Sequence, residues 1–487
     1  GTVNGSAGNM TVAETGNPTN VGAVTNSGMT LTQTGGTISS LASDAAGAVS
    51  NLNGGDISGT TTITDGTVNV GGGTLTGATS VATGTLNVTS GTTGAVDIAS
   101  GAVNTSGTLA GTTVGAVTNS GGTLTQTGGT VASLASDNAA SVSNINGGEI
   151  SGTTSVTNGT VTVGGGTLTG ASSVSGAGTL AITSGTAGAV NGIAGTLNIS
   201  GTLAGTTVGA VSTNGTAVTM SGGTVDSFTT AGGPVALNGG QITNAANLNG
   251  GAVTIAGADI QGTTTVDGAS VTMNSGTLAG MQVTSGDVTV NNGTAGAVTN
   301  NATFTLSGGT IGAVTNTNTF IHSGGTAGSM NNSGTYRLTG AGTPSVTGNV
   351  TNSGTLDAAT DAGAQSLTVG GTFDHSGNIT DVGGLSITAG SVILRSGALF
   401  DGTNDLDGGI QFSGPVTNEA DLDVTGAMTL TGALVNSATG VLDIGAAVAM
   451  GANAVTNDGT MNVLAAGTVT TTGGVTNTAT MDVDGTV

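Results

Sequence analysis

The segment DGTNDLDGG, which begins at Asp401, is the part of the sequence best equipped to bind a metal ion. Its Asp and Asn side chains offer the oxygen ligands that Ca²⁺ prefers, and its Gly residues permit the bend that surrounds an ion. The segment lacks the spacing of an EF-hand, because Thr403 and Gly414 stand where the first and twelfth positions need ligands. The calcium-binding nonapeptide repeats of β-helices are absent as well. The residues predict a calcium site at Asp401, Asp405 and Asp407.

The same region invites an alternative interpretation as an acid-base site. Glu419, Asp421 and Asp423 follow these aspartates at about the distance of one repeat. Acid-base chemistry needs clustered carboxylates, usually with a Lys or Arg to stabilise developing negative charge, and Arg395 is the one cation nearby. Solvated carboxylates at corners of the chain explain the cluster better. We therefore predict no catalytic residue and no cofactor-binding residue.

His322 and His375 are the only two histidines. Neither belongs to a metal-binding motif, because Cys is absent and no HExxH sequence occurs. His322 falls in a row of otherwise apolar residues when Phe320 is aligned with Phe304. The sequence predicts a local register shift that buries Ile321 in place of His322.

The composition favours β-structure with many turns over a helical or disordered chain. Of 487 residues 95 are Gly, 1% are aromatic and none is Trp, so a core must consist of Val, Ile, Leu and Ala. Gly loses about 1 kcal/mol against Ala in a helix, and the abundant Thr, Val, Asn and Ser are also poor helix formers. Disorder requires high charge and low hydrophobicity, whereas mean hydropathy is +0.25 and only 6% of residues are charged.

The charge excludes whole classes of partner. The formal net charge is -23, and Arg337 and Arg395 are the only certain cations. Nucleic acids and anionic lipids both attract basic surfaces, so neither is an expected partner. A membrane-spanning helix needs about 20 consecutive apolar residues. No apolar run approaches that length, so no direct membrane insertion is expected. An acidic, weakly charged chain suits a salty exterior, which predicts an extracellular protein. Without a signal-peptide pattern after Gly1, the chain is interpreted as a mature or excised segment.

A large internal duplication organises the first half of the chain. Segment 22–114 is nearly copied in 115–208, from GAVTNSG at the start to SGTLAGTTV at the end. A third, more divergent copy occupies 209–295, and 1–21 is interpreted as a first turn. Such duplications suit stacked units that contact only their neighbours. An active site in the first copy would recur in the second, and neither copy contains a chemically distinctive cluster. The duplication therefore favours a structural role.

A shorter period follows the large copies. In 296–343 apolar residues recur with a constant period of 16, and in 344–487 the period lengthens to 19 or 20. The rows that this periodicity predicts are Val298, Val314 and Met330; Phe304, Phe320 and Tyr336; Val416, Val435, Val455 and Val475; and Leu422, Leu442, Met461 and Met481.

These rows predict the fold. Residues two apart on a strand face the same side, and each turn shows three inward-facing stations separated by Gly, Asn or Thr corners. We expect an all-β, three-sided parallel β-solenoid with 16–20 residues per turn, continuous over 22–487. Turns stacked about 4.8 Å apart would pair each strand with its equivalents above and below. An Asn ladder at one corner is expected from Asn300, Asn316, Asn332, Asn352, Asn418, Asn457 and Asn477.

The C-terminal segment carries a recurring motif, V-T-N-x-G-T-L-x-V. It resembles the passenger repeats of autotransporters and of the filamentous haemagglutinins, which are right-handed parallel β-helices on bacterial surfaces. The resemblance spans 344–487 well and 22–343 loosely, and it implies a right-handed solenoid at a bacterial cell surface. No protease-like insertion or long non-repeat domain accompanies the motif, so secretion route and head-domain function are not transferred. The motif occurs as VTNSGTLDA at Val350, VTNEADLDV at Val416, VTNDGTMNV at Val455 and VTNTATMDV at Val475.

Three classes of function are consistent with these features. The preferred one is an extracellular structural or adhesive protein, such as a stalk, fibre subunit or surface-layer component, that self-associates or belongs to a longer parent chain. Cell-surface glycans are a further candidate partner. A carbohydrate-binding or carbohydrate-cleaving β-helix is an alternative, disfavoured by six Phe, one Tyr and no Trp. An ice or mineral binder is the third, which requires one regular outward row of Thr or Asp. We do not expect an enzyme.

Overall fold

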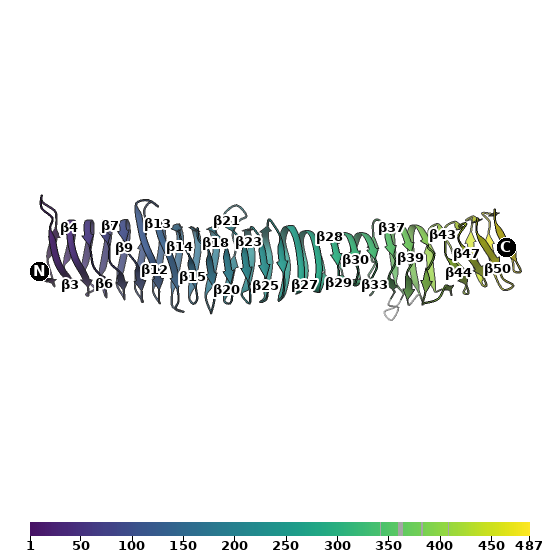
Figure 1. The fold of residues 1–487 in the computed structure, drawn as a ribbon, viewed down its shortest axis with the longest axis horizontal. Helices are drawn as coiled ribbons and strands as arrows, with labels where there is room; N and C mark the ends of the chain where they lie inside the picture. The colour runs from purple at the N-terminus through teal and green to yellow at the C-terminus, as the bar shows by residue number, and fades with distance from the viewer. Residues whose placement is uncertain (341, 359–363, 381–382, 408) are drawn as a thin grey trace. The chain divides into compact units, whose positions relative to one another are not determined.

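The computed structural model describes residues 1–340, 342–358, 364–380, 383–407 and 409–487, which form two compact units, Gly1–Ala246 and Asn247–Val487. Within the described residues every regular element is a β-strand. Among the same residues there is no helix that is long and apolar enough to cross a membrane. In each unit, strands of successive turns lie side by side (Figure 1).

The strands of the first unit are short and closely spaced. They are β1 (Val3–Gly5), β2 (Asn9–Val12), β3 (Asn20–Asn26), β4 (Thr30–Ser43), β5 (Val49–Ile57), β6 (Thr61–Ile63), β7 (Thr67–Leu75), β8 (Thr79–Val81), β9 (Thr85–Thr93), β10 (Val96–Ile98), β11 (Ala102–Thr105), β12 (Thr112–Asn119), β13 (Thr123–Ser136), β14 (Val142–Ile150), β15 (Thr154–Val156), β16 (Thr160–Leu168), β17 (Ser172–Val174), β18 (Thr179–Ala187), β19 (Val190–Gly192), β20 (Thr196–Ile199), β21 (Thr206–Val208), β22 (Val211–Thr213), β23 (Ala217–Val225), β24 (Phe228–Thr230), β25 (Val235–Ile242) and β26 (Ala246–Leu248), the last of which crosses the boundary.

After the end of β26, the first strand of the second unit is also its longest. Its strands are β27 (Ala252–Val290), β28 (Thr294–Asn300), β29 (Thr303–Leu306), β30 (Thr310–Asn316), β31 (Thr319–His322), β32 (Thr326–Asn332), β33 (Thr335–Leu338), β34 (Ser345–Val346), β35 (Val350–Asn352), β36 (Thr355–Asp357), β37 (Ser366–His375), β38 (Asn378–Thr380), β39 (Leu385–Leu394), β40 (Leu399–Phe400), β41 (Asp405–Leu406), β42 (Ile410–Ser413), β43 (Val416–Asn418), β44 (Asp421–Val424), β45 (Met428–Thr429), β46 (Leu434–Asn436), β47 (Val441–Ile444), β48 (Ala447–Gly451), β49 (Val455–Asn457), β50 (Thr460–Val463), β51 (Thr468–Thr471), β52 (Val475–Asn477) and β53 (Thr480–Val483).

Parallel pairing between turns defines both units as β-solenoids, with about 25 turns in all. In the first unit Val24 of β3 pairs with Leu41 of β4, and Leu41 pairs in turn with Thr61 of β6. The turn from Leu394 to Asn418 is longer than these two because it contains an additional loop. The predicted all-β parallel solenoid is confirmed, while its three-sided section, right-handed winding and division into repeat segments stay predictions.

The core of each unit consists of stacked inward-facing side chains. Val, Leu and Ile supply most of them, and all six Phe and Tyr336 are buried as well. Alternation along each strand puts the intervening Thr, Asn and Ser residues on the outside. Burial of one aliphatic side chain contributes about 1.5–3 kcal/mol, so stability is distributed over many small contributions.

The two large copies reproduce the same interior contacts. The Asn26 amide donates to Ser50 Oγ at 3.0 Å, and Asn119 donates to Ser143 Oγ at 3.1 Å in the corresponding place. Each of these Asn side chains also accepts a backbone N–H from three residues later in the chain, that of Met29 and that of Gly122. The duplication is thus repeated at the level of individual polar contacts.

Most of the predicted rows are confirmed by the strand registers. Val298, Val314 and Met330 stack in β28, β30 and β32. The other confirmed rows are Phe304, Phe320 and Tyr336, and Leu422, Leu442, Met461 and Met481.

The predicted row through Val435 is wrong at that residue. Leu434, which is 5% exposed, pairs with Val416 below it and with Val455 above it. The reason lies in Asn436, whose side chain is buried in a polar ladder. Because residues two apart share a face, Leu434 must point inward with Asn436, and Val435 points outward.

The hexapeptide SGTLAG occurs three times and adopts two structures. Leu109 and Leu203 lie in loops that precede β12 and β21, where they are 53% and 51% exposed. Leu278, at the same place in the third occurrence, lies in β27, pairs with Ala295 and is 1% exposed. In the first occurrence Val114, which follows the leucine, is the buried residue instead. The solenoid therefore accommodates extra residues as outward loops.

Candidate functional site

The segment that follows β40, a loop and the short strand β41, holds the residues predicted to bind calcium. The chain reverses there, because Phe400 and Thr403 exchange backbone hydrogen bonds of 2.6 and 3.0 Å, and the Thr403 hydroxyl also donates to the Phe400 carbonyl at 3.0 Å. Asp401 lies in this turn with a φ of 49°. It is the one residue other than Gly with positive φ in the described part of the chain.

The three predicted ligands do not converge. Asp405 pairs with Asp423 of the next turn, and the Asp407 carboxylate accepts the Gly409 N–H at 2.9 Å. In the part of the chain that the structure describes, no three His, Asp or Glu side chains come close enough together to hold a metal ion. Calcium binding at Asp401, Asp405 and Asp407 stays a prediction.

Calcium can be tested by thermal unfolding. If the loop binds the ion, calcium at about 100 times its dissociation constant stabilises the fold by about 2.7 kcal/mol. We expect the calcium-dependent rise in melting temperature to disappear in an Asp405→Asn/Asp407→Asn variant. Equal melting temperatures for the unaltered chain in calcium and in chelator would contradict the prediction.

Carboxylates do gather in one outward column of the second unit. Asp405, Asp423 and Asp443 occupy paired positions in β41, β44 and β47. Burial raises the pKa of Asp423, and the charges of Asp443, Asp405 and Asp421 raise it further. One turn on, the Asn462 amide donates to Asp443 Oδ1 at 2.6 Å. The column thus brings Asp405 and Asp423 together, as their spacing predicted, but as like charges.

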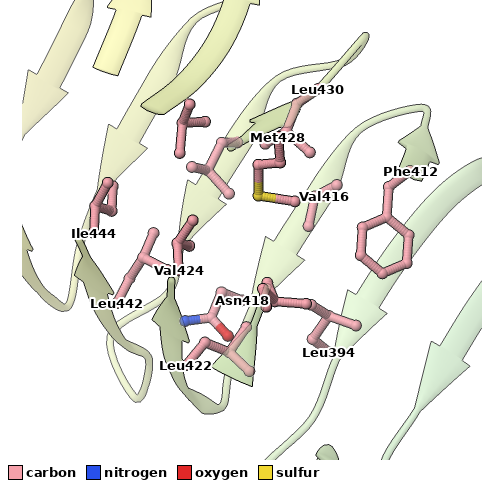
Figure 2. A pocket seen from close by; sticks show the side chains of 13 residues that line it. Leu394, Phe412, Val416, Asn418, Leu422, Val424, Met428, Leu430, Leu442 and Ile444 are labelled. Carbon is pink, nitrogen blue, oxygen red and sulfur yellow. The ribbon is translucent and has the colours of Figure 1, made fainter. Parts of the chain in front are cut away.

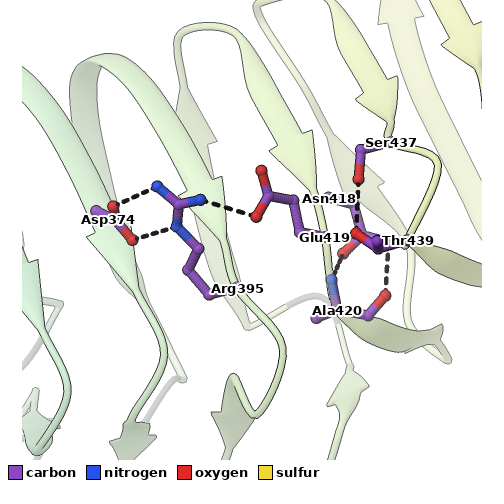
Figure 3. A network of polar contacts seen from close by, with 7 residues as sticks. All are labelled: Asp374, Arg395, Asn418, Glu419, Ala420, Ser437 and Thr439. Atoms are coloured by element: carbon purple, nitrogen blue, oxygen red, sulfur yellow. Dashed lines mark hydrogen bonds and ion pairs between the residues drawn. The ribbon is translucent and has the colours of Figure 1, made fainter.

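Arg395 does not pair with this column but forms ion pairs with two other carboxylates (Figure 3). Its Nε and Nη2 donate to the two carboxylate oxygens of Asp374 at 3.0 and 2.8 Å, and Nη1 donates to Glu419 Oε2 at 2.8 Å. The hydrogen bonds to Asp374 and Glu419 raise the pKa of Arg395. Glu419, which the sequence grouped with the acidic cluster, instead joins Asp374 and Arg395 in a clamp across three successive turns.

Loss of the clamp is expected to destabilise the second unit by about 1 kcal/mol in an Arg395→Met variant, which retains most of the aliphatic stem. The effect is small because the Arg395 side chain is 41% exposed. Arg337→Met is the matched control, since Arg337 makes one ion pair, with Asp357 at 3.3 Å. Urea midpoints that fall equally in both variants, or a loss unaffected by 1 M NaCl, would contradict the network.

A polar hollow of about 370 Å³ lies beside the same loop. Its walls come from 396–399, from 402–404 and from Asp421. Leu399 is 37% exposed and offers an apolar surface, while Thr403, Asn404 and Asp421 offer a hydroxyl, an amide and a carboxylate. These groups suit apolar contact and hydrogen bonds with a small neutral polar molecule. No pattern in the sequence indicates it, because it depends on how two loops meet.

The interior of the second unit contains a small apolar cavity of about 20 Å³ (Figure 2). Phe412, Met428 and Leu442 are among its lining residues, and Asn418 is the single polar one. The N–H groups of the Asn418 amide already have acceptors, because they donate to Ala420 O, Asn436 Oδ1 and Val441 O. An apolar cavity of this size therefore offers a ligand no polar partner.

His322 contradicts the predicted register shift. It pairs with Leu306 on one side and Leu338 on the other and is fully buried, while Ile321 is only half-buried on the outside. Its ring is satisfied there, because Nδ1 lies 2.8 Å from the Tyr336 hydroxyl and Nε2 lies 3.3 Å from the Gly325 carbonyl. The stacked ring of Tyr336 in the next turn makes the histidine acceptable in the core.

His375 is buried in a similar way. Nδ1 lies 3.0 Å from the Asn352 amide nitrogen, so it accepts, and Nε2 faces the Leu399 carbonyl at 3.5 Å. Burial lowers the pKa of both His322 and His375 to about 4. Both rings are therefore neutral at physiological pH, and each serves as an internal hydrogen-bonding group.

The predicted Asn residues do form hydrogen-bonded ladders, but as two ladders instead of one, because His375 and Leu394 occupy the column between Asn352 and Asn418. Asn300 donates to Asn316 Oδ1 at 2.7 Å, and Asn316 donates to Asn332 Oδ1 at 2.6 Å. The ladder continues through Asn352 and ends on His375. A second ladder joins Asn418, Asn436, Asn457 and Asn477. Asn436 was missed because the sequence alignment placed Val435 in the inward row.

A comparison with protein-family models, curated proteins and solved structures found no match to this chain.

Proposed function

We propose that the chain is an extracellular structural or adhesive β-solenoid of a bacterial cell surface, acting as a stalk, fibre subunit or surface-layer component that projects or self-associates. The observation that carries the proposal is the duplication. The two large copies repeat the same interior contacts, as at Asn26 and Asn119. Repetition of core contacts extends a coil without adding a reactive group, which is what a spacer or scaffold requires.

Charge and chemistry support the same role. The net charge of -23 with two arginines suits a screened exterior, and both arginines are engaged in ion pairs that link turns. Carboxylates gather in the column through Asp423 beside one another rather than around a cation. We propose a role without catalysis.

The location can be tested on the cells that produce the protein. Antibodies raised against the recombinant chain are expected to label intact cells in immuno-electron microscopy, and external protease is expected to remove the label. Labelling only after the cells are permeabilised would overturn the proposal.

Neutral glycan binding is a second candidate, favoured by the hollow beside Leu399 and Asp421. All seven aromatic residues are buried, so the stacking platforms that usually bind sugars are not on the surface. Any affinity is then expected to be weak. Saturation-transfer NMR with neutral monosaccharides tests it, and signals that are unchanged in an Asp421→Ala variant would place the binding elsewhere. The ice or mineral alternative needs one regular outward row of Thr or Asp. The Asp405 column gives way to Asn462, whereas Thr277, Thr294, Thr310 and Thr326 pair in consecutive turns, so this alternative stays a hypothesis.

A further inference from the structure

Two adjacent outward columns run through twelve turns of the first unit. Each residue of a column pairs with the next without any register shift. We call these two columns together the neutral face. The first column consists of Asn9, Thr30, Val49, Thr67, Thr85, Ala102, Thr123, Val142, Thr160, Thr179, Thr196 and Ala217. The second consists of Thr11, Thr32, Asn51, Asn69, Asn87, Asn104, Thr125, Asn144, Thr162, Ala181, Asn198 and Thr219.

The neutral face carries no charge, although the chain is strongly acidic. The acidic residues of the paired strands lie elsewhere in the turn: Asp56 and Glu149 on the far part of β5 and β14, and Asp97 on β10. In the second unit, the outward columns that flank the Phe304 row include Asp287, Arg337 and Asp357, among other residues. An uncharged double column is therefore a feature of the first unit and not a property of every outward surface.

The polar groups of the neutral face are already partly satisfied within it. Asn69 donates to Asn51 at 2.9 Å, Asn87 donates to Asn69 at 2.8 Å, and Asn104 donates to Asn87 at 2.9 Å. Amides that hydrogen-bond along the column need less from water, so covering them costs less than covering free amides. The short Thr, Val and Ala side chains also lose little rotamer freedom when they are covered.

We propose that the neutral face packs against the same face of a second copy of this chain. Two copies with a net charge of -23 repel each other, and the repulsion is least where uncharged surfaces meet. Stacked strands with identical side chains form interdigitated interfaces of this kind. The inference rests on the proposed structural function and names the surface through which self-association occurs.

The area of the neutral face matches a reversible contact. Twelve turns at ~4.8 Å span about 50 Å, and two outward columns on a strand cover roughly 10 Å in width, which gives about 500 Å² per copy. A standard stable interface buries about 800 Å² per partner. Because this area is below that of a standard stable interface, we expect a weak, reversible contact instead of a permanent dimer.

The test places charged side chains at two different outward positions along the same two strands, one inside the neutral face and one outside it. Thr85→Glu/Thr179→Glu alters the neutral face in β9 and β18. Thr92→Glu/Thr186→Glu is the matched control, because it makes the same change of charge at exposed positions further along those two strands. Melting temperatures establish that both variants fold.

Sedimentation velocity over a range of concentrations is expected to show dimers of the unaltered chain and of the control, and at least tenfold weaker association of the neutral-face variant. A monomeric unaltered chain would overturn the inference. So would equal weakening of both variants, which indicates general repulsion, or equal association of both, which places the contact elsewhere. None of these outcomes affects the cell-surface labelling that tests the proposed function.

A cross-linking experiment gives an independent readout, because the chain has no Cys. Ala102 lies in the sixth of the twelve rows, so it is close to its own counterpart when two neutral faces are related by a two-fold axis. Ala102→Cys is expected to form a disulfide-linked dimer under mild oxidation, whereas Thr113→Cys, in β12 on another outward column, is not. Equal yields from the two variants would contradict face-to-face packing.

Discussion

Acidification from pH 6.5 to pH 4 is expected to lower the free energy of unfolding of the second unit by about 3 kcal/mol for each buried histidine, His322 and His375. Burial lowers the pKa of each ring from 6.5 to about 4. Between these values the unfolded chain binds a proton that the folded chain does not, so stability falls as pH falls. At 1.36 kcal/mol per unit, a shift of this size corresponds to about 3 kcal/mol.

The geometry of His375 explains why protonation is unfavourable. Nδ1 accepts from the Asn352 amide at 3.0 Å, and the same Asn352 presents its oxygen to the Asn332 amide at 2.6 Å. A proton on Nδ1 would place two donors against each other, and the amide cannot be flipped without breaking the ladder. His322 lacks this restriction, because the Tyr336 hydroxyl can rotate to accept.

Chemical denaturation from pH 4 to pH 7 measures the effect. A His322→Leu/Tyr336→Phe/His375→Asn variant keeps every carboxylate and provides apolar or amide groups of the kind found in neighbouring turns. We expect its stability to change much less over this range than that of the unaltered chain. An equally steep pH dependence in the variant would assign the acid sensitivity to carboxylates instead of the two histidines.

Substitution of Asn316 by Val is expected to destabilise the turns around it by about 3 kcal/mol. The Asn316 amide donates to Asn332 Oδ1 at 2.6 Å and to Thr335 O at 3.0 Å, and its oxygen accepts from Asn300. Valine leaves these buried groups without partners, and each unsatisfied group costs about 1–3 kcal/mol. Because turns couple to their neighbours, the loss should remain local.

The matched experiment replaces the ladder as a unit. In the first unit, apolar Ile63, Val81 and Ile98 stack in consecutive turns, so such a column can be apolar when its neighbours are. The triple Asn300→Val/Asn316→Val/Asn332→Val variant is expected to lose less stability than the sum of its three single variants. Hydrogen exchange should show lost protection near β30 and retained protection in β47 and β50. Additive losses, or protection lost throughout the chain, would contradict the ladder argument.

The sequence predicted the fold and most rows because identical spacing recurs in neighbouring turns. The row Val298, Val314 and Met330 needs only a constant period and the alternation of a strand. The prediction failed at Val435, where the corner changed length and the polar Asn436 determined which residues face inward.

His322 failed for a different reason. Burial of a histidine depends on a partner in the next turn, and the Tyr336 hydroxyl that supplies it was interpreted only as part of an aromatic row. The candidate site was less predictable than the fold. Asp405 and Asp423 pair as their spacing predicted, but Asp401, Asp405 and Asp407 do not converge, and the hollow beside Leu399 depends on how two loops pack.

The two structures of the SGTLAG hexapeptide bear on how such a chain acquires new properties. Around Leu109 and Leu203 extra residues leave the coil as a loop while the strands on both sides keep their register, whereas around Leu278 the same letters are part of a strand. Extra residues at that corner thus leave the pairing of the stacked strands unchanged. In a duplicated solenoid with such corners, new loops can arise one at a time without disturbing the strands. For the same reason, the positions of Leu109 and Leu203 are suited to the insertion of foreign peptides.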